Sequence, residues 1–291
     1  MNLYNSQQLL FSQTQPVARY KTRPLPVPRD FYDKGFTVFD SISSPEKAQQ
    51  TAELFLANLD TERLPLLTNI QDRIQLVKAD AIPMCGDSVE TSFQALHFDM
   101  GQPIISEQPQ LMISAVALYH PFGTPASGTK TRILSLKGLF SQPKHKEAEA
   151  VEKKLISYVK HYGDGWADTN TYRLQCFARV VDAVNGTNEL ANYRDKTMAQ
   201  WFKGGKNANG SQSLKNEQLF YEKRGIYLDK IETGVELLPG QMVIIDNTRV
   251  VHGRFGKRAA KEIYQFMFGL EAAVADIDCF RTELVKELTS V

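Results

Sequence analysis

The chain has 291 residues, of which 42% are hydrophobic, and this is enough apolar surface for one full globular core. Its 34 Lys and Arg balance 33 Asp and Glu to a formal charge of +1, so composition gives no reason to expect nucleic acid or an anionic membrane as a partner. No apolar window is long enough for a membrane span, and we expect neither a signal peptide nor a transmembrane helix. Three cysteines in no close spacing argue against a disulfide scaffold or a thiolate zinc site and favour a reducing, cytoplasmic compartment.

The N-terminal segment, residues 1–30, is predicted to be an extended strap on the surface. Prolines recur through it among Arg and Lys, and proline removes backbone donors and favours extended conformations. Residues 31–291 are predicted to form a single domain, with a helical and loop insertion around residues 144–220.

Local patterns predict the first elements in chain order. Residues 36–39 are predicted to form a strand, and Ser44 followed by Pro45 is typical of an N-cap and first helical position, leading into a helix over residues 48–59. Apolar runs then predict buried strands, and apolar residues three and four apart predict an amphipathic helix. The strands are expected at residues 111–118 and 131–136, and the helix at residues 144–162.

The later part of the chain is dominated by short strand-like runs. Residues 204–216 are rich in Gly, Asn and Ser and predict a loop, either a lid or a disordered insertion. Strand-like runs follow at residues 226–228, 235–237, 241–246 and 262–270. Many short strands between turn signals indicate a mainly β fold with flanking helices, a sandwich or jelly roll. Residues 275–288 predict a packing helix, with a dimer contact as the alternative.

The segment Leu96-His97-Phe98-Asp99 contains the first candidate metal ligands. Side chains at i and i+2 of a strand point to the same face, so His97 and Asp99 can bind one ion from a single short segment. This spacing is common by chance, and alone it does not identify a site.

His252 is the second candidate. An apolar strand starts after Pro239-Gly240 and ends in the polar residues 246–249, and His252 follows shortly after. For His252 alone, a hydrogen-bonded structural histidine is the alternative. With His97 and Asp99 it completes a set of two imidazoles and one carboxylate, the facial triad that leaves iron positions open for oxygen and a co-substrate.

Two strings around these residues resemble a known family. IIDNTRVVHGR is similar to the distal-histidine segment of the iron(II)/2-oxoglutarate dioxygenases of the taurine dioxygenase, clavaminate synthase and γ-butyrobetaine hydroxylase group, and ALHFD resembles that group's proximal motif. The resemblance spans residues 95–270. It implies a double-stranded β-helix (jelly roll, cupin-like) in which His97, Asp99 and His252 bind Fe(II), with 2-oxoglutarate and O2 as co-substrates. The retained Asp99 implies hydroxylation, desaturation or cyclisation instead of halogenation.

One departure from the family concerns 2-oxoglutarate. The family places an arginine on the strand after the distal histidine, where it pairs with the far carboxylate, but residues 262–268 contain no arginine. Arg258 is our first choice as a replacement because it lies between the distal histidine and that strand. The other candidates are Arg254, Lys261 and, from a neighbouring strand, Arg132. Thr131 matches the family's threonine that contacts 2-oxoglutarate, with an ordinary strand threonine as the alternative.

Three further polar residues have two interpretations each. Asp246 and Asn247 are expected either to orient His252 through hydrogen bonds or to form a turn. His120 ends a strand and is expected to be structural, with a place in a pocket as the alternative.

The leading hypothesis is an Fe(II)/2-oxoglutarate-dependent oxygenase acting on a small molecule, such as an amino acid or a biosynthetic intermediate derived from one. A non-haem iron oxidase or lyase that does not use 2-oxoglutarate would explain the missing arginine. The third hypothesis is a cupin-like binding protein without catalysis. A zinc hydrolase is disfavoured, because those sites more often use three histidines or two with a glutamate.

Overall fold

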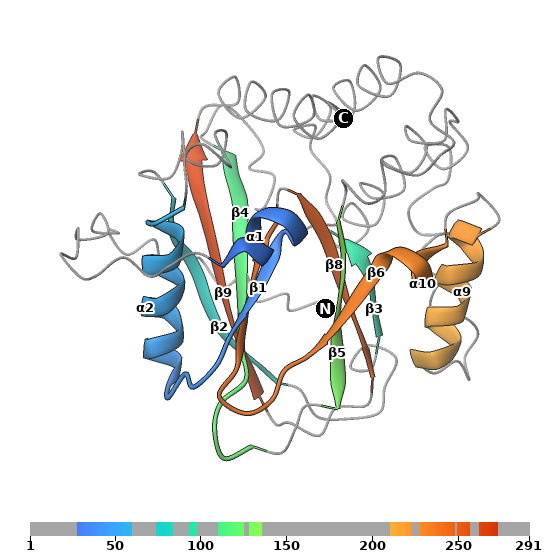
Figure 1. The fold of residues 1–291 in the computed structure, drawn as a ribbon, viewed down its shortest axis with the longest axis horizontal. Helices are drawn as coiled ribbons and strands as arrows, with labels where there is room; N and C mark the ends of the chain where they lie inside the picture. Colours follow the sequence, from blue (N-terminus) through green and yellow to red (C-terminus); the bar gives the residue numbers. More distant parts are fainter. Residues whose placement is uncertain are drawn as a thin grey trace, which may run out of the picture.

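The computed structural model describes residues 28–59, 74–83, 93–97, 110–124, 128–135, 210–222, 227–247, 249–256 and 262–272. Within these ranges the chain forms two antiparallel sheets that face each other, with helices on their outer sides (Figure 1). The predicted mainly β class with flanking helices is therefore confirmed. The predicted strap over residues 1–30 lies almost wholly outside the described residues, as does most of the predicted insertion.

The first sheet has five strands, and its central strand is β4. The order across the sheet is β1 (Phe36–Phe39), β7 (Met242–Asp246), β4 (Gln110–Tyr119), β9 (Glu262–Ala272) and β2 (Gln75–Pro83). Each neighbouring pair is antiparallel. Strands from the beginning and the end of the chain therefore alternate across this sheet.

The second sheet has four strands, in the order β3 (Phe93–His97), β8 (Val250–Gly256), β5 (Thr129–Ser135) and β6 (Glu232–Glu236). From β2 to β9 in chain order, every step crosses to the other sheet except the step from β5 to β6. Segments that are distant in sequence thus become neighbours in the four-stranded sheet, and β3 lies beside β8.

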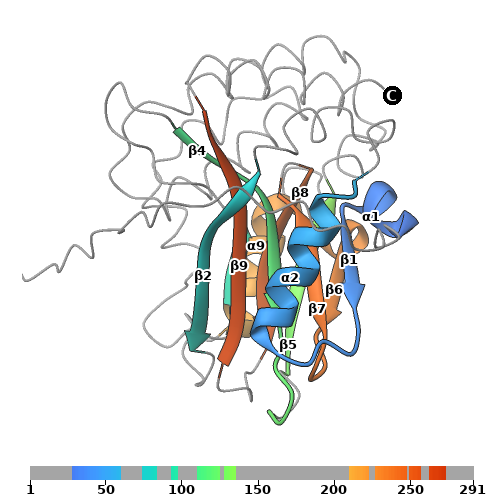
Figure 2. The ribbon, with the colours of Figure 1, turned by 90° about the vertical axis from the view of Figure 1, so that its left-hand side faces the viewer.

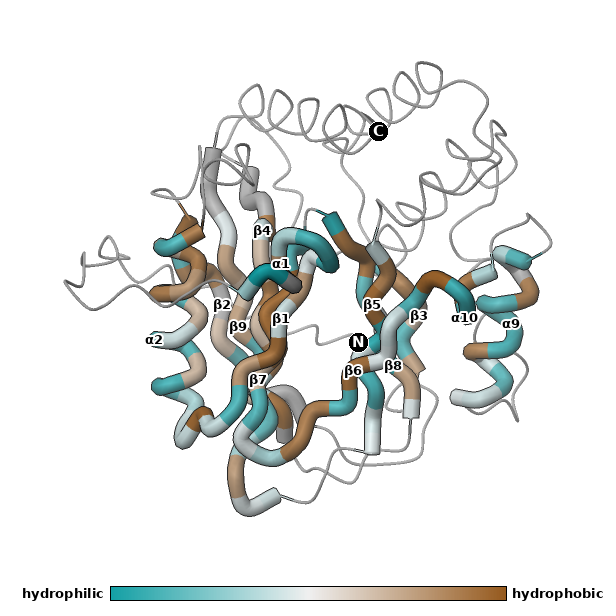
Figure 3. Tube along the Cα trace, in the orientation of Figure 1, coloured by the Kyte–Doolittle hydropathy of each residue, from teal (hydrophilic) through white to brown (hydrophobic). Residues whose placement is uncertain are grey.

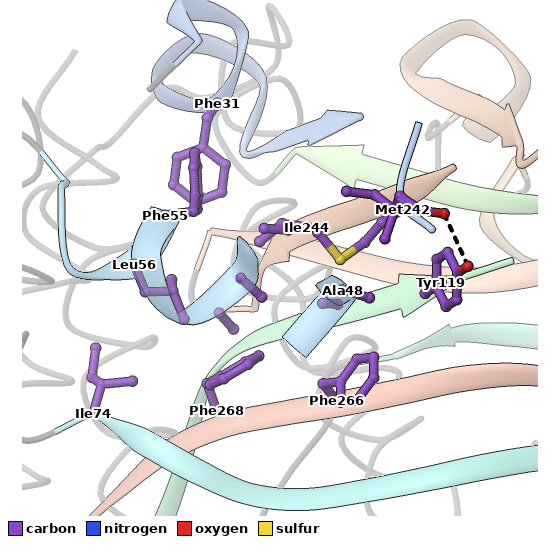
Figure 4. Close-up of a cluster of buried hydrophobic side chains, with 14 of the residues drawn as sticks. Phe31, Ala48, Phe55, Leu56, Ile74, Tyr119, Met242, Ile244, Phe266 and Phe268 are labelled. Carbon is purple, nitrogen blue, oxygen red and sulfur yellow. Dashed lines mark hydrogen bonds between the residues drawn. The ribbon is translucent and has the colours of Figure 1, made fainter. Parts of the chain in front are cut away.

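Helices α1 (Arg29–Lys34) and α2 (Pro45–Leu56) lie on the five-stranded sheet, and Figure 2 shows α2 lying across its outer face. The Ser44 hydroxyl accepts the backbone N–H of Lys47 at 3.2 Å, and Pro45 begins the helix, as predicted. Apolar side chains from α2 and from the sheet pack together beneath the helix, as Figure 4 shows. They include Ala48, Ala52, Phe55, Leu56, Ile244, Phe266 and Phe268.

The space between the two sheets holds a second apolar cluster. Ile133 of β5 and Val250 of β8 pack there with Val243 and Ile245 of β7. Figure 3 shows that the strands of both sheets carry hydrophobic and hydrophilic residues, whereas α9 is mostly hydrophilic. Side chains that share a face with Ile133 and Val250 therefore point into the space between the sheets.

Helices α9 (Gly210–Glu222) and α10 (Leu228–Ile231) lie beside the four-stranded sheet. The prediction of a loop over residues 204–216 is wrong for residues 210–216, which are helical, and the prediction of a strand at residues 226–228 is wrong at Leu228, which begins α10. The buried positions of α9 include Ser213, Glu217 and Tyr221, each four residues from the next. Two of these three buried residues are polar. A search for apolar residues at helical spacing therefore does not detect the helix.

The other local predictions lie close to the observed elements. The strand over residues 36–39 is confirmed, and those at residues 111–118 and 131–136 correspond to β4 and β5 within two residues. The predicted helices at residues 144–162 and 275–288 lie outside the described residues. None of the described helices is long and apolar enough to cross a membrane.

Candidate metal centre

His97 and His252 lie side by side in the four-stranded sheet. The two residues are direct partners in the antiparallel pairing of β3 with β8, and their ring centroids are 4.7 Å apart with the planes inclined at 48°. Their side chains are 3% and 5% exposed, respectively. The structure therefore brings together two of the three predicted metal ligands from distant parts of the sequence.

The two imidazoles point into the space between the sheets. His252 is the cross-strand partner of Ile133, and directly opposed residues of an antiparallel pair project from the same face. Ile133 packs against Val243 and Ile245 of the opposite sheet. The histidine pair thus lies on the inner face of the four-stranded sheet.

A backbone carbonyl sets the orientation of the His97 ring. Nδ1 of His97 lies 2.8 Å from the carbonyl oxygen of Ala95. Because a carbonyl oxygen only accepts, Nδ1 carries the hydrogen and donates it, which leaves the lone pair on Nε2. The Gln94 amide nitrogen lies 3.3 Å from Nε2 and donates to it. A histidine whose other ring nitrogen donates to a carbonyl is the usual form of a metal ligand.

A β-bulge in β3 creates this arrangement. The pairing with β8 shifts between Gln94 and His97, and Gly253 lies at this point of β8. A Cβ atom on Gly253 would lie 2.6 Å from the Gln94 carbonyl oxygen and 3.0 Å from that of Ala95. Only glycine therefore allows the bulged carbonyls to approach β8 this closely.

The third predicted ligand, Asp99, lies outside the described residues, two positions beyond the end of β3. Among the described residues, no group of three His, Cys, Asp or Glu side chains is gathered around one point. Two buried imidazoles, one of them in the ligating tautomer, fit the nitrogen part of a two-histidine, one-carboxylate site. The role of Asp99 stays a prediction.

Arg254 follows the histidine pair along the same inner face. It is two residues beyond His252 on β8, and its direct partners are Gln94 on β3 and Thr131 on β5. Nη1 of Arg254 is 3.4 Å from Oε1 of Gln94. Burial lowers the pKa of Arg254 to about 10, because desolvation disfavours the cation. An arginine and a threonine, both candidates for binding 2-oxoglutarate, thus occupy one row beside the histidines.

Arg132 lies on the opposite face of the same sheet. Its cross-strand partner is Gly253, which is adjacent to His252 on β8 and therefore faces the other side of the sheet. The Arg132 guanidinium pairs with Glu217 of α9 at 2.5 Å and with Glu232 of β6 at 2.6 Å. The two carboxylates outweigh the effect of burial and raise the pKa of Arg132. This placement removes Arg132 from the candidates for binding 2-oxoglutarate beside His252. Arg258 and Lys261 lie outside the described residues.

Asp246 and Asn247 brace the connection between β7 and β8. The Asp246 carboxylate accepts from Nε of Arg249 at 2.6 Å, and the Asn247 amide donates to the Ile113 carbonyl at 2.9 Å. The Asp246 contact and the bond from the Arg249 N–H to the Asp246 carbonyl at 3.2 Å belong to a turn, and the role of the two residues in orienting His252 stays a prediction. His120 is fully buried at the end of β4 with Nδ1 3.1 Å from the Thr124 hydroxyl, as expected for a structural histidine.

Sequence reasoning missed two polar residues of this region, Gln94 and Glu217. Gln94 is three residues before His97, and on a regular strand the two side chains would face opposite sides. The bulge places them on the same face, which the alternation of a regular strand does not predict. Glu217 lies in a stretch whose composition indicated a loop. Gly253, directly after the distal histidine, was the available sequence signal for a close backbone approach.

No protein-family model and no curated protein matches the chain. Solved structures to which this chain is similar include AAD-2 in complex with Mn(II) and N-oxalylglycine, with a TM-score of 0.42 and 11% identity over 84% of this chain and 88% of the other. The Kdo hydroxylase KdoO, a non-heme Fe(II) alphaketoglutarate-dependent dioxygenase, gives a TM-score of 0.33 and 12% identity, covering 83% and 67% of the two chains. A taurine dioxygenase from Burkholderia xenovorans gives 0.32 and 10%, covering 82% and 77%.

These solved structures include dioxygenases of the kind that the two sequence strings resemble. At TM-scores below 0.5 and identities of 10–12%, such superpositions establish neither a shared activity nor shared site residues.

Proposed function

We propose that this chain is an Fe(II)- and 2-oxoglutarate-dependent oxygenase of a small molecule, built on a double-stranded β-helix. The observation that carries the proposal is the pairing of buried His97 with buried His252 in register on the inner face of the four-stranded sheet. The alternation of successive strands between two antiparallel sheets supports the double-stranded β-helix, because this connectivity is characteristic of jelly rolls.

The proposed iron ligands are His97, Asp99 and His252. Bound iron would supply open positions at which 2-oxoglutarate and dioxygen meet, so that decarboxylation of the first is coupled to oxidation of the substrate. The chain itself holds the His97 ring through the Ala95 carbonyl, which leaves the lone pair on Nε2, and iron would take the place of the Gln94 amide that donates to Nε2 in this structure. Ile133, the cross-strand partner of His252, belongs to the apolar cluster between the sheets, so apolar side chains adjoin one side of the histidine pair.

Arg254, together with Thr131, is our proposed partner for the far carboxylate of 2-oxoglutarate. Arg254 is one same-face step along β8 from His252, roughly 7 Å. A partly buried guanidinium whose pKa is lowered by desolvation gains from a carboxylate partner, and its planar fork suits bidentate pairing. We propose Arg254 in place of Arg258, the first choice from the sequence, because Arg254 is paired with Thr131 and lies two residues from His252 on β8.

The test is an anaerobic titration of the apo-protein with Fe(II) and then with 2-oxoglutarate, followed by the visible charge-transfer band of the chelate. We expect a saturable band for the native chain and loss of iron binding in His97→Ala and His252→Ala. Arg254→Met should leave the iron affinity intact but raise the 2-oxoglutarate requirement about 10- to 100-fold, the loss of one charge-assisted contact of about 1.5–3 kcal/mol. Arg258→Met is the matched control.

Each contrary outcome selects an alternative. Iron binding without the band would favour a 2-oxoglutarate-independent oxidase or lyase with the same ligands. Absence of iron binding in the native chain would favour a non-catalytic cupin-like binding protein. A larger effect of Arg258→Met than of Arg254→Met would reverse the assignment of the carboxylate partner.

A further inference from the structure

Glu217 of α9 is a fully buried carboxylate that reaches two strands of the sheet. Its Oε2 accepts from Nη1 of Arg132 on β5 at 2.5 Å, and its Oε1 accepts the backbone N–H of Leu96 on β3 at 2.8 Å. Burial raises the pKa of Glu217, while Arg132 and the Leu96 N–H oppose that effect. The ion pair with Arg132 therefore involves only one oxygen of the Glu217 carboxylate. The other oxygen is hydrogen-bonded to β3.

The contact with Leu96 reaches the peptide group that orients His97. The N–H of Leu96 and the carbonyl of Ala95 belong to one peptide unit, and that carbonyl accepts Nδ1–H of His97 at 2.8 Å. Both residues belong to the β-bulge, where the regular ladder with β8 is interrupted. The ladder therefore constrains the plane of this peptide less than elsewhere, and Glu217 supplies a constraint from outside the sheet.

We propose that Glu217 is a positioning residue for His97 and acts through the Ala95–Leu96 peptide; this inference rests on the proposed role of His97 as a metal ligand. A carboxylate on the N–H polarises the peptide and strengthens its carbonyl as an acceptor. A stronger acceptor on Nδ1–H fixes the ring and makes Nε2 a better donor, as a carboxylate bonded directly to a ligating histidine does.

The cluster around Arg132 provides a control for a purely structural role. Glu232 of β6 accepts from Nε and Nη2 of Arg132 at 3.1 and 2.6 Å, yet it reaches Arg132 from the side of the sheet remote from β3. Glu232→Gln perturbs the same ion cluster and leaves the contact between Glu217 and Leu96 in place. We expect its metal affinity to equal that of the native chain.

The decisive comparison uses two double variants, Arg132→Met/Glu217→Gln and Arg132→Met/Glu217→Leu. Both remove the buried ion pair and leave Glu232 in the same state. Glutamine keeps a side-chain carbonyl oxygen for the Leu96 N–H, and leucine does not. We expect Co(II) to bind the leucine variant about 10- to 100-fold more weakly than the glutamine variant. Urea unfolding of both variants shows whether a difference in stability accounts for this.

A second measurement does not require metal. Nitrogen chemical shifts of the His97 ring in the metal-free variants report which nitrogen is protonated, and we expect the Nδ1–H form in the glutamine variant and a tautomer mixture in the leucine variant. Equal Co(II) affinities and equal ring shifts in the two variants would overturn the proposal. Failure of the native chain to bind Co(II) would overturn the proposed function instead, while the ring shifts would still decide whether Glu217 orients His97.

Discussion

The two sheets hold their outer helices by opposite means. Helix α2 packs on the five-stranded sheet through an apolar cluster that includes Phe55 and Ile244, whereas α9 reaches the four-stranded sheet through a buried ion pair between Glu217 and Arg132. Apolar contacts are non-directional, but a carboxylate bonded to a guanidinium and to a peptide N–H fixes an orientation. The histidine pair lies in the four-stranded sheet, which has the directional contact. We therefore interpret the apolar interface of α2 as support for the fold and the charged interface of α9 as support for the site.

The largest expected effect comes from breaking the charged interface on one side. Arg132→Met leaves the buried Glu217 without its cation, and the free energy of unfolding should fall by about 3–5 kcal/mol at pH 8. Burial raises the pKa of Glu217, and loss of Arg132 removes the main opposing effect. The folded state of the variant therefore binds a proton more tightly than the unfolded state, and its stability should recover as pH falls. Urea unfolding at pH 8 and pH 5 checks this; a loss independent of pH would contradict it.

A substitution in the apolar interface beneath α2 should lower the free energy of unfolding by an amount that does not depend on pH. Ile244→Ala removes a fully buried side chain beneath α2, and we expect a loss of about 2–5 kcal/mol. Because no titratable group is involved, the loss should be the same at pH 5 and pH 8. The Co(II) affinity of the folded variant should equal that of the native chain, and a weaker affinity would show that the two interfaces are not separate in function.

Gly253→Ala tests the bulge that joins the two histidine strands. The new methyl group would lie 2.6 Å from the Gln94 carbonyl oxygen, so β3 has to move away from β8. Overpacking of this kind costs about 1–3 kcal/mol. We expect weaker Co(II) binding along with this modest loss of stability, measured by titration and urea unfolding. Native affinity in a folded variant would show that the close approach is not needed for His97.

The smallest expected effect is at the start of α2. Ser44→Ala removes the hydroxyl that accepts the Lys47 N–H, and the free energy of unfolding should fall by about 1 kcal/mol. Ser44→Asp is the matched control, because aspartate also caps helices. A loss in Ser44→Asp as large as in Ser44→Ala would mean that the cap contributes little to holding α2.

The sequence was informative where local rules decide the outcome. The Ser44-Pro45 start of α2 and the β1 strand follow from capping and strand propensity, and both are confirmed. The proximity of His97 and His252 was expected from motif resemblance, and the pairing of β3 with β8 brings the two together.

The missed features depend on register, which is not local. Arg132 was a candidate for binding 2-oxoglutarate because it lies on a neighbouring strand. Successive residues of a strand face opposite sides, however, and the register with β8 decides which of them faces His252. In α9, Glu217 is buried because it pairs with Arg132, a cation on β5. The polar composition of this segment, taken alone, therefore indicated a loop. Neither fact can be obtained from the segment that contains the residue.

The sheet order has a consequence for how the chain folds. Among the described strands, every pairing except that of β5 with β6 involves β7, β8 or β9, which all lie beyond residue 241. During synthesis the earlier strands therefore emerge without these neighbours, and sheets closed by such distant contacts form slowly. His97 meets His252 only when β8 docks, so Co(II) capture during refolding should report completion of the sheets and not an early collapse.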